Sequence, residues 1–348
     1  MVDDEFLLLM CHSEKRWTDD NSPSIEAGPQ YVLSVGDRKR LYDVGIRTAH
    51  EQPSWDSIEP AKGEFDWSYL DAMINRNRES GLKSLIQFHG WRLPRWIPDE
   101  WKAQRQDGVH EIDVLSMWNK EAQEQSDKSY LAVDAHYKDD LDVEFFFGEW
   151  QGSEGAYPLT YCYYDWAALE DYKRTYGASA VPDINTSETL DWYGKRVIEH
   201  FVRRGTLLYP KFKEVWNCQQ HLMDNWGKGF GNYVQPDILK EFRRLYPDGC
   251  IVLLQYTYYD PAHLQDNVEY VDKIRNAYNC ETLVEAMYCS GLPTTTPRAI
   301  AHGFRGQIVR PAFQNQVNRL ENWHVNNIRV ANELWRKHYE DSGNLSHI

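Results

Sequence analysis

The chain has 348 residues, of which 42% are hydrophobic and 26% charged, and its formal net charge is −15 at pH 7. This length and composition are typical of a globular protein with material for one large core. The acidic balance and the lack of any basic run argue against nucleic acid and anionic membranes as partners, since both require concentrated Lys and Arg.

The chain starts with an acidic stretch, MVDDEFLLLMCHSEKRW, that lacks the basic and long apolar regions of a secretory signal. No segment reaches the roughly 20 apolar residues of a membrane span. The six cysteines are scattered without a CxxC pair, so we expect reduced thiols. These features predict a soluble, cytoplasmic protein.

Eight short apolar runs, rich in β-branched or aromatic residues, follow one another along the chain. Each is too short for a helix and is typical of a buried strand. In chain order they are FLLLMCH (6–12), GIRTAHE (45–51), KSLIQFHG (83–90), VEFFFGEW (143–150), KEVWN (213–217), CIVLLQYTYY (250–259), TLVEAMY (282–288) and GQIVRPAF (306–313).

Helical patterns lie between these runs. Apolar residues recur at helical spacing over 67–74 and 190–202, and a long amphipathic helix is expected over 319–340. Pro297, after Thr296, is expected at a first helical position.

Eight strands alternating with helices predict a parallel sheet covered by helices, and eight is the number that closes a (β/α)8 TIM barrel. We therefore expect one barrel domain over 1–348. A doubly wound open sheet is the alternative, but the chain has no Gly-rich dinucleotide turn. The least regular stretches, 98–142 and 151–187, predict enlarged loops after strands 3 and 4, where barrel active sites are built.

Two carboxylates stand out among the polar residues at the strand ends. Strand four runs into GEWQGSEGAYPLTY, with Glu149 and Glu154, and strand seven contains Glu285. Carboxylates at the ends of strands four and seven would face each other across a barrel mouth. Such a pair is what glycosidic cleavage needs, because one group protonates the leaving oxygen and the other attacks the anomeric carbon or activates water.

Aromatic and polar residues at the other strand ends are the candidates for contact with a sugar. The 14 Trp and 22 Tyr of the chain suit stacking on sugar faces. The predicted substrate-binding residues are Trp55, His89, Trp91, Arg92, Glu149, Ser153, Tyr157, Trp216, Asn217, Tyr256 and Tyr288.

The stretch SWDSIEPAKGEFDWSYLDAMINRNRESGLKSLIQFHGWRLPRWI (54–97) resembles the region from the second to the third strand of the clan A barrel glycoside hydrolases. It is similar to both the β-amylase family and the family 42 β-galactosidases. SEGAYPLTY resembles a β-amylase phrase in which the acid Glu is followed by Tyr-Pro. The resemblance is good over 45–100, local around 145–165, and only positional for strands five to eight.

The resemblance implies a glycoside hydrolase with Glu154 as the proton donor, Glu285 as the nucleophile or base, and His89 in contact with the sugar. Most clan members have Asn directly before the acid Glu, whereas this chain has Ser153. Either Ser153 substitutes for that Asn, or the acid is Glu149. Most of the clan retains the anomeric configuration while the β-amylase-like phrase belongs to an inverting family, and we slightly favour retention.

Two other classes of function are alternatives to hydrolysis. A catalytically silent carbohydrate-binding barrel is the alternative, although both Glu154 and Glu285 are present. A barrel lyase or isomerase would call for a strand-end Lys or a metal cluster. His221 and Asp224 have no third ligand at useful spacing, so we expect neither a metal nor another cofactor.

Overall fold

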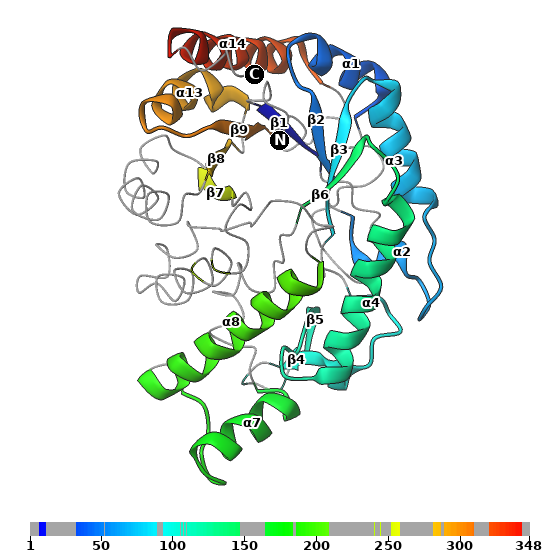
Figure 1. Cartoon of the computed structure of the whole chain (residues 1–348), viewed down its shortest axis with the longest axis vertical. Helices are drawn as coiled ribbons and strands as arrows, with labels where there is room; N and C mark the ends of the chain where they lie inside the picture. The colour runs from blue at the N-terminus through cyan, green and yellow to red at the C-terminus, as the bar shows by residue number, and fades with distance from the viewer. Residues whose placement is uncertain are drawn as a thin grey trace.

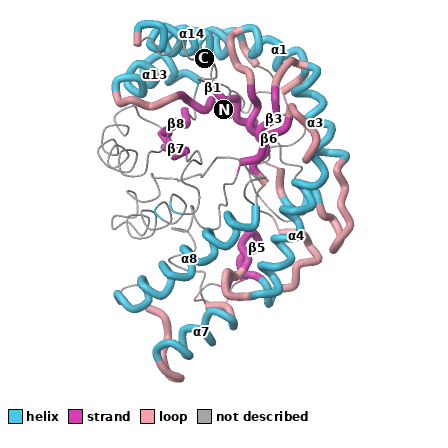
Figure 2. The backbone as a smooth tube through the Cα atoms, viewed as in Figure 1, coloured by secondary structure: helices cyan, strands magenta, loops and turns pink. Residues whose placement is uncertain are grey.

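The computed structural model describes residues 7–11, 33–51, 53–88, 93–104, 106, 108, 110–146, 164–183, 186–208, 240, 244, 252–257, 281–286, 289–309 and 320–342. Figure 1 shows the described helices α1, α3, α13 and α14 on the outside of the strands. Figure 2 gives the same arrangement by type of secondary structure.

Seven parallel strands form one sheet in the order β6-β3-β2-β1-β9-β8-β7. The strands are β1 (Leu7–Cys11), β2 (Thr48–Glu51), β3 (Lys83–Gln87), β6 (Val143–Phe146), β7 (Val252–Thr257), β8 (Glu281–Ala286) and β9 (Gly306–Val309). The first strand pairs with both the second and the last strand of the chain. This cyclic order is that of a barrel and differs from a doubly wound open sheet.

All seven strands coincide with or overlap the predicted apolar runs, which confirms those seven predictions. The remaining predicted strand, 213–217, lies outside the described residues. It falls in the sequence between β6 and β7, the two strands at the ends of the described sheet.

Helices follow most of the strands. They are α1 (Val35–Asp43), α2 (Trp55–Ile58), α3 (Ser68–Glu79), α4 (Lys120–Tyr137), α7 (Trp166–Tyr176), α8 (Ser187–Leu208), α13 (Leu292–Ala301) and α14 (Asn322–Asp341). Ser34, Asn119 and Asp165 accept backbone hydrogen bonds at the starts of α1, α4 and α7, respectively. These caps satisfy amide groups that a helix leaves unpaired at its first turn. The helices predicted over 67–74, 190–202 and 319–340 are confirmed by α3, α8 and α14.

One helix start differs from the prediction. Pro297 lies inside α13, which begins at Leu292, and Pro293 takes an early helical position instead. A Pro at the first turn costs no hydrogen bond, so Pro293 fits there, whereas Pro297 lies beyond the first turn.

The connection between β3 and α4 contains structure of its own. It includes the 3-10 helix η2 (Asp99–Trp101) and a two-stranded antiparallel sheet of β4 (Lys102–Gln104) and β5 (His110–Leu115). It follows the carboxyl end of a barrel strand, the end at which barrel active sites are built.

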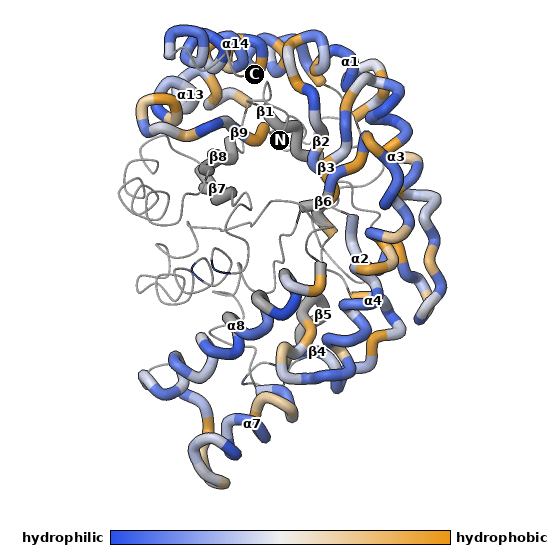
Figure 3. The backbone as a smooth tube through the Cα atoms, viewed as in Figure 1, coloured by the Kyte–Doolittle hydropathy of each residue, from blue (hydrophilic) through white to orange (hydrophobic). Residues whose placement is uncertain are grey.

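Side chains alternate across the strands. Ala49 of β2 and Val309 of β9 are fully buried in a cluster with residues of α1, α13 and α14, so these positions face the helices. The intervening positions, such as Thr48, His50 and Ile308, are buried on the opposite, inner face. Figure 3 shows hydrophilic and hydrophobic residues alternating along α1, α3 and α14, as expected of helices that cover a sheet.

Candidate active site

The predicted carboxylate Glu285 is the penultimate residue of β8, and Tyr256 is the penultimate residue of β7. The two positions pair in the strand register, and position 285 also pairs with Ile308 of β9. Val309 faces the helices, so Ile308 faces the inner side of the strands, and positions 285 and 256 lie in register with Ile308. The backbone thus gives both residues positions near the carboxyl ends of adjacent strands, while their chemical roles stay predictions.

Most of the other predicted site residues cannot be placed in this way. Those outside the described residues are His89, Trp91, Arg92, Glu149, Ser153, Glu154, Tyr157, Trp216, Asn217 and Tyr288. Their predicted roles stay predictions.

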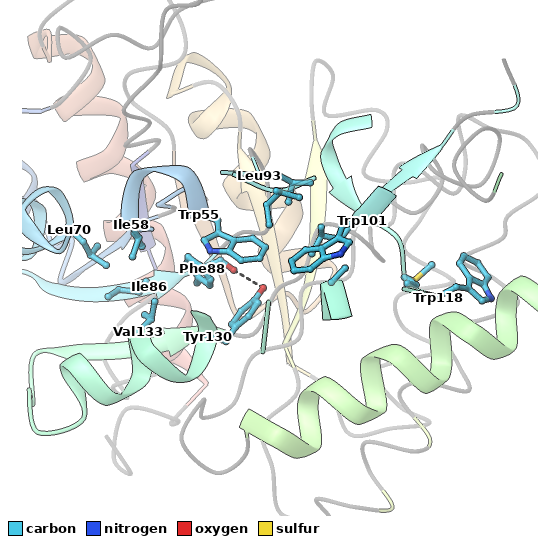
Figure 4. Close-up of a cluster of buried hydrophobic side chains, with 14 of the residues drawn as sticks. Trp55, Ile58, Leu70, Ile86, Phe88, Leu93, Trp101, Trp118, Tyr130 and Val133 are labelled. Atoms are coloured by element: carbon cyan, nitrogen blue, oxygen red, sulfur yellow. Dashed lines mark hydrogen bonds between the residues drawn. The ribbon is translucent and has the colours of Figure 1, made fainter. Parts of the chain in front are cut away.

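The segment that carries His89, Trp91 and Arg92 is bounded by two buried residues. Phe88 is 1% exposed and Leu93 is 7% exposed. The Tyr130 hydroxyl of α4 donates to the Phe88 carbonyl oxygen at 3.0 Å, and Figure 4 shows this bond beside Trp55. Helix α4 therefore fixes the point at which the chain leaves β3 for the predicted sugar-binding segment.

Trp55 begins the short helix α2 and is fully buried. Its ring packs edge-on against Trp96 with ring centroids 5.8 Å apart. Its indole nitrogen donates to Glu59 at 2.6 Å. The structure thus shows a packing role for Trp55, whereas its predicted contact with a sugar stays a prediction.

Glu59, at the end of α2, has an exposed fraction of 0% and accepts four hydrogen bonds. Its Oε2 accepts from the Trp55 indole and from the Ser129 hydroxyl. Its Oε1 accepts from the Gly63 backbone amide at 2.7 Å and from the Gln125 side chain at 3.1 Å. Within the described residues no cationic side chain forms an ion pair with it, and its four hydrogen-bond donors there are neutral groups.

Glu51, the last residue of β2, is a second glutamate with an exposed fraction of 0%. It lies on the helix-facing side, where Arg38 of α1 forms an ion pair with its Oε1 at 2.9 Å. Asn77 of α3 donates to the same oxygen at 2.8 Å. Oε2 has no hydrogen-bond partner within the described part of the chain. Glu51 therefore joins the strand to two helices behind it.

His50, one residue earlier, is buried on the inner face of β2. The sequence places His50 and Glu51 together at the end of the second strand, without a role for either. The alternation of side chains separates them, because adjacent residues of a strand face opposite sides. The sequence carries no signal that assigns His50 rather than Glu51 to the inner face, because both faces of this strand are buried.

Asp165 caps α7 after the long segment that follows β6. Its Oδ1 accepts from the Ser116 hydroxyl at 2.8 Å and from the Ala168 amide at 3.1 Å. Its Oδ2 is buried without a hydrogen-bond partner in the described residues. Burial raises the pKa of the Asp165 carboxyl above its ordinary value, and the hydrogen bonds to Ser116 and the α7 backbone oppose that rise only in part.

Metal sites and membrane helices were also sought in the described ranges. Within them no group of three or more His, Cys, Asp or Glu side chains could hold a metal ion. None of the helices described there has the length and apolar character needed to cross a membrane.

Sequence comparison finds a match in the first half of the chain. Residues 35–140, from α1 to the end of α4, match the model of glycoside hydrolase family 42, described as β-galactosidase. The β-galactosidase BgaH of Haloferax lucentense is 29% identical over 100 residues, which cover 28% of this chain and 13% of that protein.

Structural comparison covers nearly the whole chain. The catalytic domain of the Paenibacillus polymyxa β-amylase has a TM-score of 0.69 at 15% identity, over 97% of this chain and 99% of that domain. The β-galactosidase of Marinomonas ef1 has a TM-score of 0.65 at 14% identity, over 97% of this chain and 60% of that one. The β-galactosidase of Halorubrum lacusprofundi has a TM-score of 0.64 at 13% identity, over 94% of this chain and 57% of that one.

The chain thus spans about three fifths of the solved β-galactosidases that it matches. At these identities the structural likeness establishes the fold alone. The chain has the fold of the TIM-barrel glycoside hydrolases, and the resemblance to β-amylases and family 42 β-galactosidases that its motifs predict is confirmed by the matched segment 35–140 and by these structural neighbours.

Proposed function

We propose that this protein is a glycoside hydrolase, with Glu154 as proton donor and Glu285 as nucleophile or base. The observation that carries the proposal is the position of Glu285, near the carboxyl end of β8 and in register with Ile308 of β9. Barrel enzymes build their active sites at that end of the strands. The match of residues 35–140 to the β-galactosidase family supports hydrolysis as the reaction.

The two carboxyl groups would divide the chemistry between them. Glu154 protonates the glycosidic oxygen as the bond breaks, which requires a proton held near neutral pH. Glu285 stays ionised and attacks the anomeric carbon, so that the product retains its configuration. Retention needs the carboxyl groups about 5–5.5 Å apart, and inversion about 6.5–9.5 Å apart.

The proposal extends to the walls of the site and to the domain. The segments after β3 and β6 line a cleft over the barrel mouth and carry six of the predicted sugar-binding residues, namely His89, Trp91, Arg92, Glu149, Ser153 and Tyr157. The whole chain, 1–348, forms one barrel domain that binds carbohydrate without a metal or another cofactor. The first substrate to test is a β-galactoside, because the matched family is described as β-galactosidase.

The experiment is the hydrolysis of a panel of aryl glycosides and oligosaccharides, headed by aryl β-galactosides. Wild type, Glu285→Gln and Glu281→Gln are assayed together; Glu281 begins the same strand and lies in the same alternating set of positions. We expect Glu285→Gln to lower kcat by about 10³-fold or more, on the scale of losing a group that acts in concert with another. Glu281→Gln, at the far end of the strand, should retain activity.

Two results would contradict the proposal. Equal rates for wild type and Glu285→Gln would remove Glu285 from the reaction. Binding of a sugar by wild type without any cleavage would favour the silent carbohydrate-binding barrel instead.

The dependence of the hydrolysis rate on the leaving group identifies the residue that acts as the proton donor. Loss of the proton donor slows substrates with poor leaving groups far more than dinitrophenyl glycosides, whose leaving oxygen needs no proton. We expect this pattern for Glu154→Gln. If Glu149→Gln shows it instead, the acid is Glu149.

A further inference from the structure

The cluster around Glu59 joins three segments that are distant in sequence. Trp55 and Gly63 lie before and after it in the connection that follows β2. Gln125 and Ser129 lie on α4. The Trp96 indole, in the connection that follows β3, donates to the Glu59 backbone carbonyl at 2.8 Å. One residue thus holds together two loops at the carboxyl ends of neighbouring strands and the helix outside them.

The four donors are matched to a carboxylate. A glutamine has one acceptor oxygen and one amide nitrogen in place of two oxygens. If its nitrogen took the place of Oε2, Ser129 could rotate its hydroxyl to accept, but the Trp55 indole N–H would face an N–H group. If the nitrogen took the place of Oε1, the Gln125 amide could flip, but the Gly63 N–H would be opposed. Either orientation therefore breaks one hydrogen bond to the loop after β2, that from Trp55 or that from Gly63.

The loop after β3 contains three of the predicted sugar contacts of the proposed active site. Trp96 lies just after the segment 89–92, whose start is fixed by the Tyr130 bond to Phe88. Glu59 and Tyr130 therefore hold the two flanks of the segment that carries the predicted sugar contacts His89, Trp91 and Arg92.

We propose that Glu59 is a positioning residue. Its buried carboxylate fixes the loop after β2 against α4 and anchors the Trp55 ring that packs on Trp96 of the loop after β3, so that the side chains of both loops meet the sugar in the proposed active site. This inference rests on the proposed glycoside hydrolase function. Glu59 itself touches no substrate, since its exposed fraction is 0% and all four of its carboxylate contacts are within the protein.

The test compares Glu59→Gln with Glu51→Gln, a matched control that is equally buried but joins β2 to α1 and α3. Steady-state kinetics on the best aryl glycoside are measured well below both melting temperatures. We expect Glu59→Gln to raise KM about 10-fold and to change kcat much less, because misplaced binding groups weaken substrate and transition state alike. Glu51→Gln should lower the melting temperature and leave KM unchanged.

Hydrogen exchange separates this inference from the proposed function. Glu59→Gln should speed exchange of the Gly63 amide and of segment 93–97, whereas Glu51→Gln should not. If wild type cleaves no glycoside, the proposed function fails and the exchange data still decide whether Glu59 holds the loops. Should Glu59→Gln fail to fold, Ser129→Ala removes one donor and should show a smaller rise in KM.

Two outcomes would overturn the inference. One is an unchanged KM in Glu59→Gln together with a loss of stability like that of Glu51→Gln. The other is unchanged exchange in both loops.

Discussion

Glu51 and Glu59 are both fully buried near the carboxyl end of β2, but they are stabilised in different ways. Glu51 faces the helices and has a guanidinium partner, Arg38. Glu59 lies beyond the strand in the loops and has four neutral donors. A buried carboxylate requires a charge partner or a full set of hydrogen bonds. The helix layer and the loop layer of this barrel are therefore held together by separate polar clusters.

Removal of Arg38, the charge partner of Glu51, should have the largest effect on the free energy of unfolding. Arg38→Met would leave Glu51 buried without its cationic partner, and with Asn77 as its remaining donor among the described residues. We expect a loss of about 3–5 kcal/mol in the free energy of unfolding, as for other buried pairs that lose one member. Urea unfolding measures it.

Lys39→Met is the control, because Lys39 lies next along α1 and is exposed. It should change the free energy of unfolding by less than about 0.5 kcal/mol. Equal effects of the two variants would show that the Arg38–Glu51 pair has no special part in stability.

A substitution in the loop layer around Glu59 should lower the free energy of unfolding less than Arg38→Met. Trp96→Phe keeps an aromatic ring against Trp55 but removes the hydrogen bond from the indole to the Glu59 carbonyl. We expect a loss of about 1 kcal/mol, the usual net value of one hydrogen bond, and a rise in KM. Thermal unfolding and kinetics measure the two effects. A stability loss without any rise in KM would mean that this bond does not position the loop for catalysis.

Asp165 extends the comparison to a buried carboxylate with one oxygen unpartnered. Because its pKa is raised in the folded state, its contribution to stability is fully present below the ordinary value near 3.8 and is lost as pH rises through the folded pKa. Asp165→Asn should therefore become more stable relative to wild type as pH rises from 4 to 7. The cap itself should be kept, since Asn caps helices about as well as Asp.

Urea unfolding at several pH values between 4 and 7 tests this dependence. A constant difference between Asp165→Asn and wild type would argue against titration of Asp165 in that range.

The smallest effect is expected at the surface. Arg78 pairs with Asp140 and Asp142, and these hydrogen bonds raise its pKa, but its side chain is 43% exposed. Arg78→Gln should cost about 0.2–1 kcal/mol, and less at high salt. A cost as large as that of Arg38→Met would remove the distinction between exposed and buried pairs on which the comparison depends.

Seven strands of the fold could be predicted because a buried strand needs a short run of β-branched, aliphatic or aromatic residues. The run 45–51, for example, contains β2. The same run does not reveal which of His50 and Glu51 faces the inside, because a run with both faces buried has no alternation of polar and apolar residues. The structure gives the answer, because Ala49 packs in the cluster with the helices. Glu51, two residues later, faces the same side, and His50 faces the inside.

The candidate site shows a similar limit. The sequence singles out Glu285 because a carboxylate inside an apolar strand is costly unless it has a task or a partner, and its catalytic role stays a prediction. The burial of Trp55 was not predicted, because a Trp at a strand end suits sugar stacking and core packing equally. Only the contacts to Glu59 and Trp96 distinguish these two environments.

The role of Glu285 is decided by the hydrolysis of the best glycoside in the panel by wild type and Glu285→Gln, with equal folding of both verified beforehand. We expect measurable cleavage by wild type and a kcat lower by about 10³-fold or more in the variant. Cleavage at the same rate by both proteins would contradict that role.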